Sequence, residues 1–362
     1  NLFIMKKIVF FTARDLSNIG GGERMLSFLA NRLSLKYDVT ILTPYVSDSY
    51  FPLEESVKKE DFGISYKLSS IKRKLGYFKI IKCLRDRIKR NDFDFFITSS
   101  SMAFTLTSLV LRKYDKRFYA WMHLSYFHPS PLILKLYDRI SLKKYNVISI
   151  NSMDVDKYIK HTKHVYLIPN PTTFSSSPIS QEVLEKSNKI ISVGRLEKGK
   201  GFDLLINICS KVFNDIPFWT LHIYGQDDGE GENLQKLISE NKMTDRIFLH
   251  KPSDTILKEY LKSSIFATAT RIESFSLVLL EACICGLPCI AYDVPSGPRD
   301  IVVDGFNGYL IKDLDEEHYI KCLKKMMTSP SCRSEFSRNA IVKSRQFDIN
   351  LILEKWYNLL DR

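Results

Sequence analysis

The feature that most constrains the fold of this chain is a regular alternation of short apolar runs with stretches of helical periodicity, which occurs twice. Runs rich in Val, Ile, Phe and Tyr predict strands at 8–12, 39–42, 95–98, 118–122, 147–150, 165–168, 190–194, 221–225, 247–250, 265–269 and 288–292. Periodic stretches predict helices at 23–35, 202–213, 232–241, 255–262, 276–285, 314–327 and 331–345. This spacing indicates βαβ units and therefore parallel sheets.

The two series predict an α/β fold class with two Rossmann-like, doubly wound domains that face a central cleft. The length of 362 residues fits two domains. The boundary lies in the Pro- and Ser-rich stretch PNPTTFSSSPISQE, so we expect domains at 1–170 and 189–345 joined by a linker at 171–188. In such sheets ligands bind beyond the carboxyl ends of the strands.

Composition restricts the class of protein further. No apolar run reaches the ~18–20 residues of a membrane span, and 8–12 is too short for a signal peptide. Seven cysteines without a secretion signal indicate reduced thiols in the cytoplasm. Cys283, Cys285 and Cys289 lack the paired spacing of a zinc site, so we expect small buried side chains there and no metal. The net charge of +12 fits nucleic acid, an anionic membrane surface or an anionic ligand, and no nucleic-acid motif is present.

The stretch RIESFSLVLLEACICG, residues 271–286, contains two glutamates eight positions apart. If a helix begins near Ser276, Glu273 lies in the loop before it and Glu281 lies inside it. The backbone N–H groups between them then form an anion site at the positive end of the helix. A nucleotide-sugar, with hydroxyls at both ends and phosphate in the middle, fits such a site. The alternative is a helix with one capping glutamate and one core glutamate paired to a basic residue.

Two glycine-containing turns carry further candidate ligand contacts. In VGRLEKGKGF a strand ends at Gly194, and Arg195 and Lys200 follow it, as suits a diphosphate; solvated loop charges are the alternative. After the first strand, Gly20 and Gly21 open a predicted helix and would let the backbone approach a ligand closely, unless they form only a turn. Neither a P-loop nor a complete dinucleotide fingerprint is present.

Together these motifs resemble the retaining glycosyltransferases of family 4, which have the GT-B fold and include enzymes of bacterial surface-polysaccharide synthesis. The segment from Glu273 to Glu281 is similar to the family's E-x7-E motif. Gly194-Arg195-Leu196 with Lys200-Gly201 matches GRL…KG, and Gly20, Gly21, Glu23 and Arg24 match GG-x-E-R. Minor matches are IPNP at 168–171 and DGFNG at 304–308; IPNP replaces the commoner IPNG, and the family often has Gly or Pro at the position of Ser276. The resemblance also implies that a C-terminal helix, about 346–362, crosses back to the first domain.

The resemblance implies roles for individual residues. Glu281 would bind ribose hydroxyls, Glu273 would hold the transferred sugar, and Arg195 with Lys200 would neutralise the diphosphate. Backbone N–H groups of Phe275, Ser276 and Leu277 would bind phosphate or sugar, Gly194 would belong to the same nucleotide-sugar site, and Gly20 and Gly21 would approach the donor from the first domain.

His123 falls where the family often has a catalytic histidine, with an ordinary strand-end histidine as the alternative and His128 as a weaker competitor. The resemblance implies transfer with retention of configuration. No metal or other cofactor is required, because the cations and the helix terminus stabilise the leaving phosphate. The letters DFDFF at 92–96 are interpreted as a strand start rather than a metal motif.

The stretch 67–90 is strongly basic and has apolar residues at helical spacing. A basic amphipathic helix indicates either an anionic membrane surface or a core-facing helix with a solvated basic face. We therefore expect a peripheral enzyme at the inner face of the cytoplasmic membrane. It would transfer a hexose or N-acetylhexosamine, from a UDP-sugar by resemblance, to a lipid-linked saccharide of O-antigen, capsule or lipopolysaccharide. The alternatives are a GDP-mannose-dependent or soluble small-acceptor enzyme and a catalytically silent sugar-nucleotide-binding partner.

Overall fold

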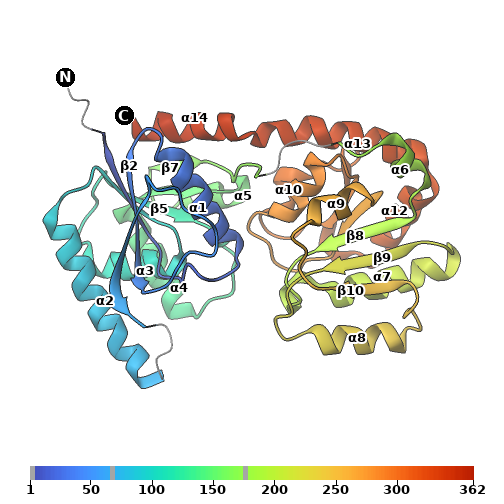
Figure 1. The fold of residues 1–362 in the computed structure, drawn as a ribbon, viewed down its shortest axis with the longest axis horizontal. Helices are drawn as coiled ribbons and strands as arrows, with labels where there is room; N and C mark the ends of the chain where they lie inside the picture. Colours follow the sequence, from blue (N-terminus) through green and yellow to red (C-terminus); the bar gives the residue numbers. More distant parts are fainter. Residues whose placement is uncertain (1–4, 66–69, 174–177) are drawn as a thin grey trace. The chain divides into compact units, whose positions relative to one another are not determined.

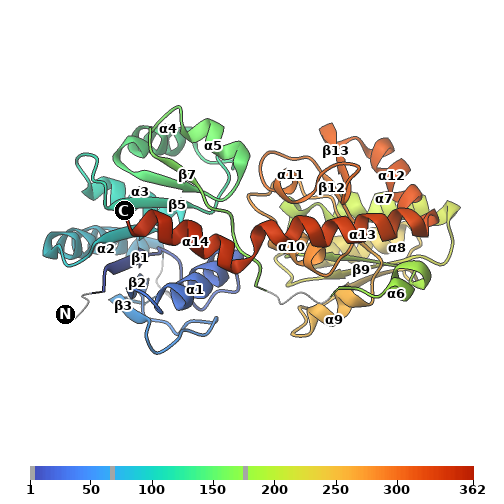
Figure 2. The same cartoon turned by 90° about the horizontal axis from the view of Figure 1, so that it is seen from above.

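The structure is a computed structural model that describes residues 5–65, 70–173 and 178–362. The chain divides into two compact units, Asn1–Asn170 with Ile352–Arg362 and Pro171–Leu351. Each unit is built on one parallel β-sheet with helices on both faces (Figures 1 and 2). The prediction of two doubly wound α/β sheets is therefore confirmed.

The first unit contains a seven-stranded sheet in the order β3-β2-β1-β4-β5-β6-β7. Its strands are β1 (Lys7–Phe11), β2 (Asp38–Tyr45), β3 (Lys58–Ile64), β4 (Phe95–Thr98), β5 (Phe118–Met122), β6 (Asn146–Ser149) and β7 (Val165–Leu167). The central strand β1 pairs with β2 on one side and β4 on the other, both in parallel. Central strands are covered on both faces, which explains why their sequences are almost continuously apolar.

Helices cover both faces of this sheet. They are α1 (Gly21–Leu33), α2 (Ser70–Arg90), α3 (Ser101–Val110), α4 (Leu132–Ser141), α5 (Ser152–Tyr158) and the C-terminal α14 (Ile349–Leu360). Val9 and Phe11 of β1 belong to the same core cluster as buried residues of α2 and α3. On the other face, Trp356 of α14 packs edge-on against Phe10 and Trp121, with ring centroids 6.4 and 5.3 Å apart. The C-terminal helix therefore completes the core of the first unit.

The second unit contains a six-stranded sheet in the order β10-β9-β8-β11-β12-β13. Its strands are β8 (Lys189–Val193), β9 (Thr220–Tyr224), β10 (Ile247–His250), β11 (Ile265–Thr268), β12 (Cys289–Tyr292) and β13 (Gly308–Ile311). Its helices are α6 (Gln181–Lys186), α7 (Phe202–Asp215), α8 (Gly231–Glu240), α9 (Ile256–Leu261), α10 (Leu277–Ile284), α11 (Pro298–Ile301), α12 (Glu316–Thr328) and α13 (Pro330–Ser344). The strand order reverses at β8, so the loops after β8 and β11 leave the sheet at a topological switch point.

Two strands were not predicted, and each has a physical reason. β3 is an edge strand of sequence KKEDFGI in which only Ile64 is buried, so it has no apolar run. β13 is only four residues long and begins at Gly308, where an added Cβ would lie 1.9 Å from the carbonyl oxygen of Cys289.

The predicted linker 171–188 is wrong in its second part, which is structured and packs on the second unit. The buried guanidinium of Arg333 donates hydrogen bonds to the carbonyl oxygens of Leu184 and Glu185, at 2.6 and 3.2 Å. The N–H of Ile179 donates to the carbonyl oxygen of Cys285. Residues 174–177 of that stretch lie outside the described residues.

The basic helix α2 uses its described apolar residues for packing within the first unit. Ile80 and Leu84 are buried in the core, and Ile81 and Ile88 pack against it, whereas Phe78 is exposed. Residues 67–69 and the side chains of 70–75 lie outside the described part of the chain. For the described residues of α2, the alternative of a core-facing helix with a solvated basic face is therefore the one that the structure supports.

No helix in the described residues has the length and apolar character needed to span a bilayer. Within the same part of the chain, no group of three or more His, Cys, Asp or Glu side chains is placed to hold a metal ion. Cys283, Cys285 and Cys289 are buried, and burial raises the pKa of Cys285 to about 12. These thiols therefore behave as small core side chains.

Candidate functional site

The candidate donor site lies where β8 and β11 end in the second unit. These strands are neighbours, with Ile265 opposite Ile190 and Phe266 opposite Ile191. The loop after β8 carries residues 194–201, and the loop after β11 carries residues 269–276. Because the strands are parallel, both loops leave the sheet at the same edge.

Backbone hydrogen bonds tie these two loops together. The carbonyl oxygen of Gly199 accepts from the N–H of Arg271 at 2.9 Å and from Oγ1 of Thr270 at 3.1 Å. Arg271 also donates to the carbonyl oxygen of Lys198 and forms a bidentate ion pair with Asp203, with both N···O distances 2.7 Å. The loops therefore form one unit, and Arg271 is a positioning residue that the sequence motifs did not indicate.

This arrangement brings Lys200 and Glu273 together, as the predicted donor site requires. Lys200 Nζ lies 2.8 Å from Glu273 Oε2, and both side chains are largely buried. The other carboxylate oxygen of Glu273 accepts a hydrogen bond from the N–H of Ser274. Gly297, at φ +40°, lies so close that an added Cβ would be 3.1 Å from Glu273 Cγ. A lysine and a carboxylate thus meet at the carboxyl edge of the sheet with their geometry fixed.

Arg195 does not join this pair in the structure. Its guanidinium lies 2.7 Å from Asp228 and 2.9 Å from Glu197, and about half of the side chain is exposed. Gly194 lies directly before Arg195. A Cβ added to Gly225 would be 1.8 Å from the carbonyl oxygen of Gly194, so the loops after β8 and β9 come into close contact at Gly225. An anion that recruited Arg195 would have to replace two carboxylates, the exposed Asp228 and the partly buried Glu197.

The helix α10 begins at Leu277, with Ser276 as its N-cap residue, close to the predicted start. The Ser276 side chain makes no capping hydrogen bond. The N–H groups of a first helical turn have no intrahelical acceptor and attract anions. Phe275 is buried against Phe347, with ring centroids 5.6 Å apart, which fixes the chain just before the helix. The helix terminus thus follows Glu273 by only a few residues.

Glu281 is buried in the second turn of α10. Its Oε2 accepts a hydrogen bond from the hydroxyl of Tyr260 at 3.2 Å, and the same hydroxyl lies 3.4 Å from the carbonyl oxygen of Val278. Tyr260 is carried by α9, so the position of Glu281 depends on that helix. The contact that the structure describes for this core glutamate is with a tyrosine, whereas the alternative expected a basic residue.

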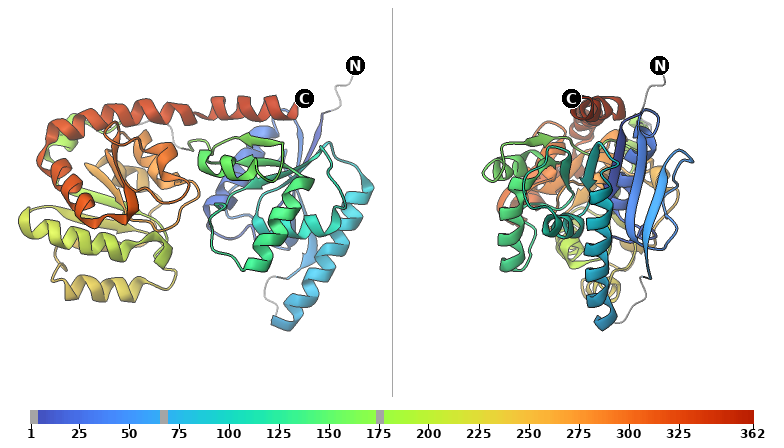
Figure 3. Two further views of the ribbon diagram at one scale, coloured as in Figure 1. Left: turned by 180° about the vertical axis from the view of Figure 1, so that it is seen from behind. Right: turned by 90° about the vertical axis from the view of Figure 1, so that its left-hand side faces the viewer.

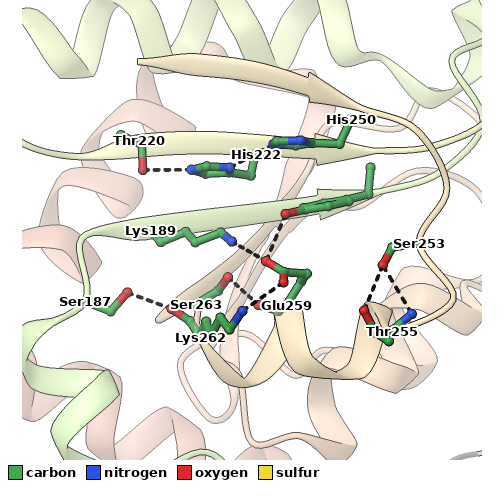
Figure 4. A network of polar contacts seen from close by, with 11 residues as sticks. Ser187, Lys189, Thr220, His222, His250, Ser253, Thr255, Glu259, Lys262 and Ser263 are labelled. Carbon is green, nitrogen blue, oxygen red and sulfur yellow. Dashed lines mark hydrogen bonds and ion pairs between the residues drawn. The ribbon is translucent and has the colours of Figure 1, made fainter. Parts of the chain in front are cut away.

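The helix α9 is anchored to the sheet by the polar network that Figure 4 shows. Glu259 accepts hydrogen bonds from Lys189 at 2.8 Å and from the Tyr224 hydroxyl at 2.9 Å. The hydrogen bond from Lys189, with smaller contributions from Tyr224 and Lys262, lowers the pKa of Glu259 to about 2. These residues belong to no motif; Lys189 and Tyr224 lie on the neighbouring strands β8 and β9, and Glu259 lies on α9.

A histidine pair continues this network toward the edge of the sheet (Figure 4). His222 Nδ1 and His250 Nε2 lie 2.9 Å apart, and the ring of Tyr224 stacks on His250 with centroids 4.4 Å apart. Burial, with the nearby charge of Lys189, lowers the pKa of His222 to about 4. The pair is therefore neutral near pH 7 and stabilises the β9–β10 edge by packing.

In the first unit, the predicted glycine turn lies between β1 and α1. Glu23 is buried, its Oε1 lies 3.2 Å from Arg14 Nη1, and a Cβ at Gly20 would be 2.2 Å from Glu23 Oε2. A side chain at Gly20 would therefore have to displace the carboxylate of Glu23 from its position in the structure. Gly21 is the first residue of α1 and is exposed.

His123 directly follows β5, as predicted. Its ring packs on Trp121 with centroids 4.1 Å apart, and its Nε2 is out of reach of water and has no hydrogen-bond partner among the described residues. Burial, with the positive charge of Arg14, lowers the pKa of His123 to about 3. The competitor His128 is exposed, and its Nδ1 lies 3.0 Å from the carbonyl oxygen of Pro129. Of the two, His123 is thus the buried histidine, and its Nε2 has no hydrogen-bond partner among the described residues.

Acidification is expected to destabilise the protein through His123. The unfolded chain binds a proton at His123 as the pH falls through about 6.5, whereas the folded chain does so only near pH 3, so stability is lost progressively between these values. The drop in Tm from about pH 7.5 to about pH 5 should be smaller in His123→Gln than in the native protein. His318→Gln, at an exposed histidine, is the matched control. An equal drop in all three proteins would show that His123 does not titrate in this way.

The first unit also has a hollow of about 570 Å³ at the carboxyl edge of its sheet. It is lined by polar, aromatic and apolar side chains, among them Arg14, Asn18, Tyr45, Tyr77 and Met102. Asp92 and Asp94 of the DFDFF stretch are engaged elsewhere. Asp92 pairs with Arg87, and Asp94 accepts a hydrogen bond from the N–H of Lys7 at 2.8 Å.

Comparison with known proteins shows which proteins this chain is similar to. Residues 175–343 match the family model of the glycosyl transferases group 1. The chain is 27% identical to the amylovoran biosynthesis glycosyltransferase AmsD of Erwinia amylovora, over 96% of this chain and 97% of that one. It is 24% identical to the Campylobacter jejuni protein named GalNAc-alpha-(1->4)-GalNAc-alpha-(1->3)-diNAcBac-PP-undecaprenol alpha-1,4-N-acetyl-D-galactosaminyltransferase, over 98% of each chain. The structure of S. aureus TarM in complex with UDP is similar to it with a TM-score of 0.77 and 15% identity, covering 99% of this chain and 100% of that one.

The second unit therefore belongs to the group 1 glycosyl transferases, and the chain as a whole is a glycosyltransferase with the GT-B fold. Homologues over nearly the full length act in bacterial polysaccharide synthesis.

Proposed function

We propose that the protein transfers a hexose or N-acetylhexosamine from a nucleotide-sugar, of the UDP class, to a lipid-linked saccharide in the synthesis of a bacterial surface polysaccharide. The observation that carries the donor assignment is the Lys200–Glu273 pair just before the N-terminus of α10. A buried cation next to a helix terminus stabilises a departing diphosphate. The carboxylate beside it accepts hydrogen bonds from sugar hydroxyls.

Each candidate donor-site residue of the second unit has a defined role in this proposal. Lys200 neutralises the β-phosphate as the bond from the sugar's anomeric carbon to the phosphate oxygen breaks. Glu273 holds hydroxyls of the transferred sugar, and Glu281, fixed by Tyr260, binds the ribose hydroxyls. The N–H groups of Phe275, Ser276 and Leu277 bind the diphosphate or the sugar. Arg195 leaves its carboxylate partners and binds the diphosphate.

We propose that the reaction retains the configuration of the anomeric carbon. The acceptor hydroxyl attacks from the face that the diphosphate leaves, its oxygen bonds to the anomeric carbon, and its proton passes to a β-phosphate oxygen. The neutral imidazole of His123 hydrogen-bonds a hydroxyl of the sugar, in keeping with its unpaired Nε2 and lowered pKa. In this scheme, Lys200 and the helix terminus supply the positive charge that a divalent metal would otherwise provide.

The acceptor is assigned to the first unit, whose hollow has the tyrosine rings and polar groups that suit a saccharide. The name of the Campylobacter jejuni relative includes an undecaprenol diphosphate, and AmsD takes part in amylovoran biosynthesis. TarM was solved with UDP. These relatives support a lipid-linked acceptor, a UDP-sugar donor and a location at the inner face of the cytoplasmic membrane.

The test is donor hydrolysis without acceptor, measured as release of nucleoside diphosphate from a panel of UDP- and GDP-sugars. We expect one UDP-sugar to be hydrolysed, with no change on addition of EDTA. Glu273→Gln should lower the rate roughly 10- to 100-fold, because a charged acceptor of hydrogen bonds to the sugar is lost. Glu232→Gln, at an exposed glutamate of α8, should leave it unchanged.

A GDP-sugar as the preferred donor would overturn the UDP assignment, and loss of activity with EDTA would overturn metal independence. If no donor is hydrolysed, the Tm with UDP and GDP decides. No shift with either nucleotide would contradict the donor site itself.

A further inference from the structure

The helix α4 of the first unit has its polar and apolar sides reversed relative to an ordinary surface helix. At ~100° per residue, Leu132, Ile133, Leu136 and Ile140 fall within a stripe ~100° wide. All four are exposed, Ile133 to 82% and Ile140 to 61%. An amphipathic helix of a soluble domain turns such a stripe toward the core. Here the apolar stripe faces outward.

The opposite side of α4 is attached to the protein by polar contacts. Asp138 Oδ1 accepts a hydrogen bond from Oγ1 of Thr105 at 3.0 Å, and the hydroxyls of Ser108 and Tyr137 lie 2.9 Å apart. Thr105 and Ser108 belong to α3, so α4 rests on α3 through its polar residues. Specific hydrogen bonds therefore hold α4 in the orientation that exposes its apolar stripe.

Cations accompany the stripe. Lys135 lies ~60° from Leu132 around the axis, on the side away from the rest of the stripe. Arg139 lies ~20° from Leu132, but it is partly buried, with its guanidinium 5.0 Å from the centroid of the Tyr126 ring. Lys143 follows α4, and Arg112 and Lys113 follow α3; all three are exposed. Asp138, the acidic residue within α4, points to Thr105 instead. An apolar stripe with basic flanks is complementary to an anionic lipid surface, whereas an apolar protein partner would require no such flanks.

We infer that α4 is the element that inserts into an anionic membrane, with its apolar stripe among the acyl chains and the neighbouring exposed cations Arg112, Lys113 and Lys143 at the phosphate groups. This rests on the proposed function, because a lipid-linked acceptor is found only at a membrane. The inference also moves the apolar membrane contact from the basic stretch 67–90, where the sequence predicted it, to α4. The described apolar residues Ile80 and Leu84 of α2 are buried in the core, so α2 contributes charge and α4 contributes the apolar contact.

The position of α4 connects this surface with the acceptor. In Figure 3, α4 lies beside α3 in the first unit, in agreement with their hydrogen bonds. Met102 and Leu106 of α3 line the hollow assigned to the saccharide, and Met102 is partly exposed. A lipid-linked saccharide whose acyl part remains in the membrane at α4 has its sugar next to α3.

The experiment measures sedimentation of the full chain with vesicles of equal parts phosphatidylglycerol and phosphatidylcholine, and with phosphatidylcholine alone. The variant is Ile133→Ser/Ile140→Ser, and the control is Leu35→Ser/Val46→Ser. The control changes two apolar residues of the same unit with matching exposure, 76% and 63%. We expect binding to the anionic vesicles, weakened by salt, to fall at least about tenfold in the α4 variant and to stay unchanged in the control.

Equal binding by the α4 variant and the native protein, or no binding of the native protein to anionic vesicles at low salt, would overturn the inference. A dimer in light scattering that the α4 variant abolishes, without vesicle binding, would assign the stripe to a second copy of the chain instead. Donor hydrolysis should be the same in all three proteins. Hydrolysis without vesicle binding therefore refutes the membrane surface alone, and vesicle binding through α4 without hydrolysis of any donor refutes the donor site alone.

Discussion

Replacing Lys200 with alanine is expected to lower the rate of donor turnover by roughly 10²–10³-fold, the usual cost of removing one group that stabilises a developing oxyanion. The ammonium of Lys200 is largely buried and lies 2.8 Å from Glu273 Oε2. In a site with little water its charge is weakly screened, so it acts strongly on a departing diphosphate. Its loss also leaves Glu273 without its cation, which weakens binding of the sugar.

The matched control is Lys198→Ala, two residues earlier in the same 3-10 turn. The Lys198 side chain is exposed, and the site uses only its backbone carbonyl oxygen, which accepts a hydrogen bond from Arg271. Steady-state kinetics should show activity close to that of the native protein. The Tm of both variants should be close to that of the native protein, so that loss of activity is not loss of fold. Equal activity of the two variants would refute the role of Lys200.

The sheets could be predicted from the sequence because their central strands are apolar on both faces. Runs such as IVFFT and IISVG stand out from the polar stretches around them. Edge strands face solvent and need no continuous apolar run, so a strand such as β3 is not predicted in this way. Strand order is also not encoded locally. β8 has β9 and β11 as neighbours, so that Lys200 and Glu273, 73 positions apart, meet at one edge.

The residues of the candidate site also fall into two groups, those that sequence motifs indicate and those that only tertiary contacts reveal. The motifs predicted Lys200, Glu273 and Glu281 as site residues, because these residue types stand at fixed positions around a predicted strand end and helix start. Tyr260, which donates to Glu281, and Arg271, which holds the two loops together through Asp203 and Lys198, were not predicted, since each acts through a tertiary contact that no spacing reveals. The apolar run LILKLYDRI shows the same limit, because a sequence does not reveal whether an apolar stripe faces a core or solvent.

Replacing Gly201 with alanine is expected to destabilise the second unit and disrupt the donor site. Gly201 has φ +65° and ψ 28°, a left-handed conformation between the 3-10 turn Lys198–Lys200 and helix α7. For an alanine this conformation costs roughly 1–2 kcal/mol. The new Cβ would also lie 1.9 Å from the carbonyl oxygen of Ala269, so one of the two loops has to move. Because Ala269 begins the loop that carries Glu273, any such movement separates Glu273 from Lys200.

Gly199→Ala, two residues away, isolates the effect of this contact. An added Cβ at Gly199 meets nothing within 4 Å, so we expect a change in stability within roughly 0.5 kcal/mol. Gly201→Ala should instead lose at least roughly 2 kcal/mol of unfolding free energy and lower the Tm by several degrees. Urea unfolding and donor hydrolysis of the two variants measure this difference. If they are equally stable and active, the approach of the two loops at Gly201 does not determine the geometry of the Lys200–Glu273 pair.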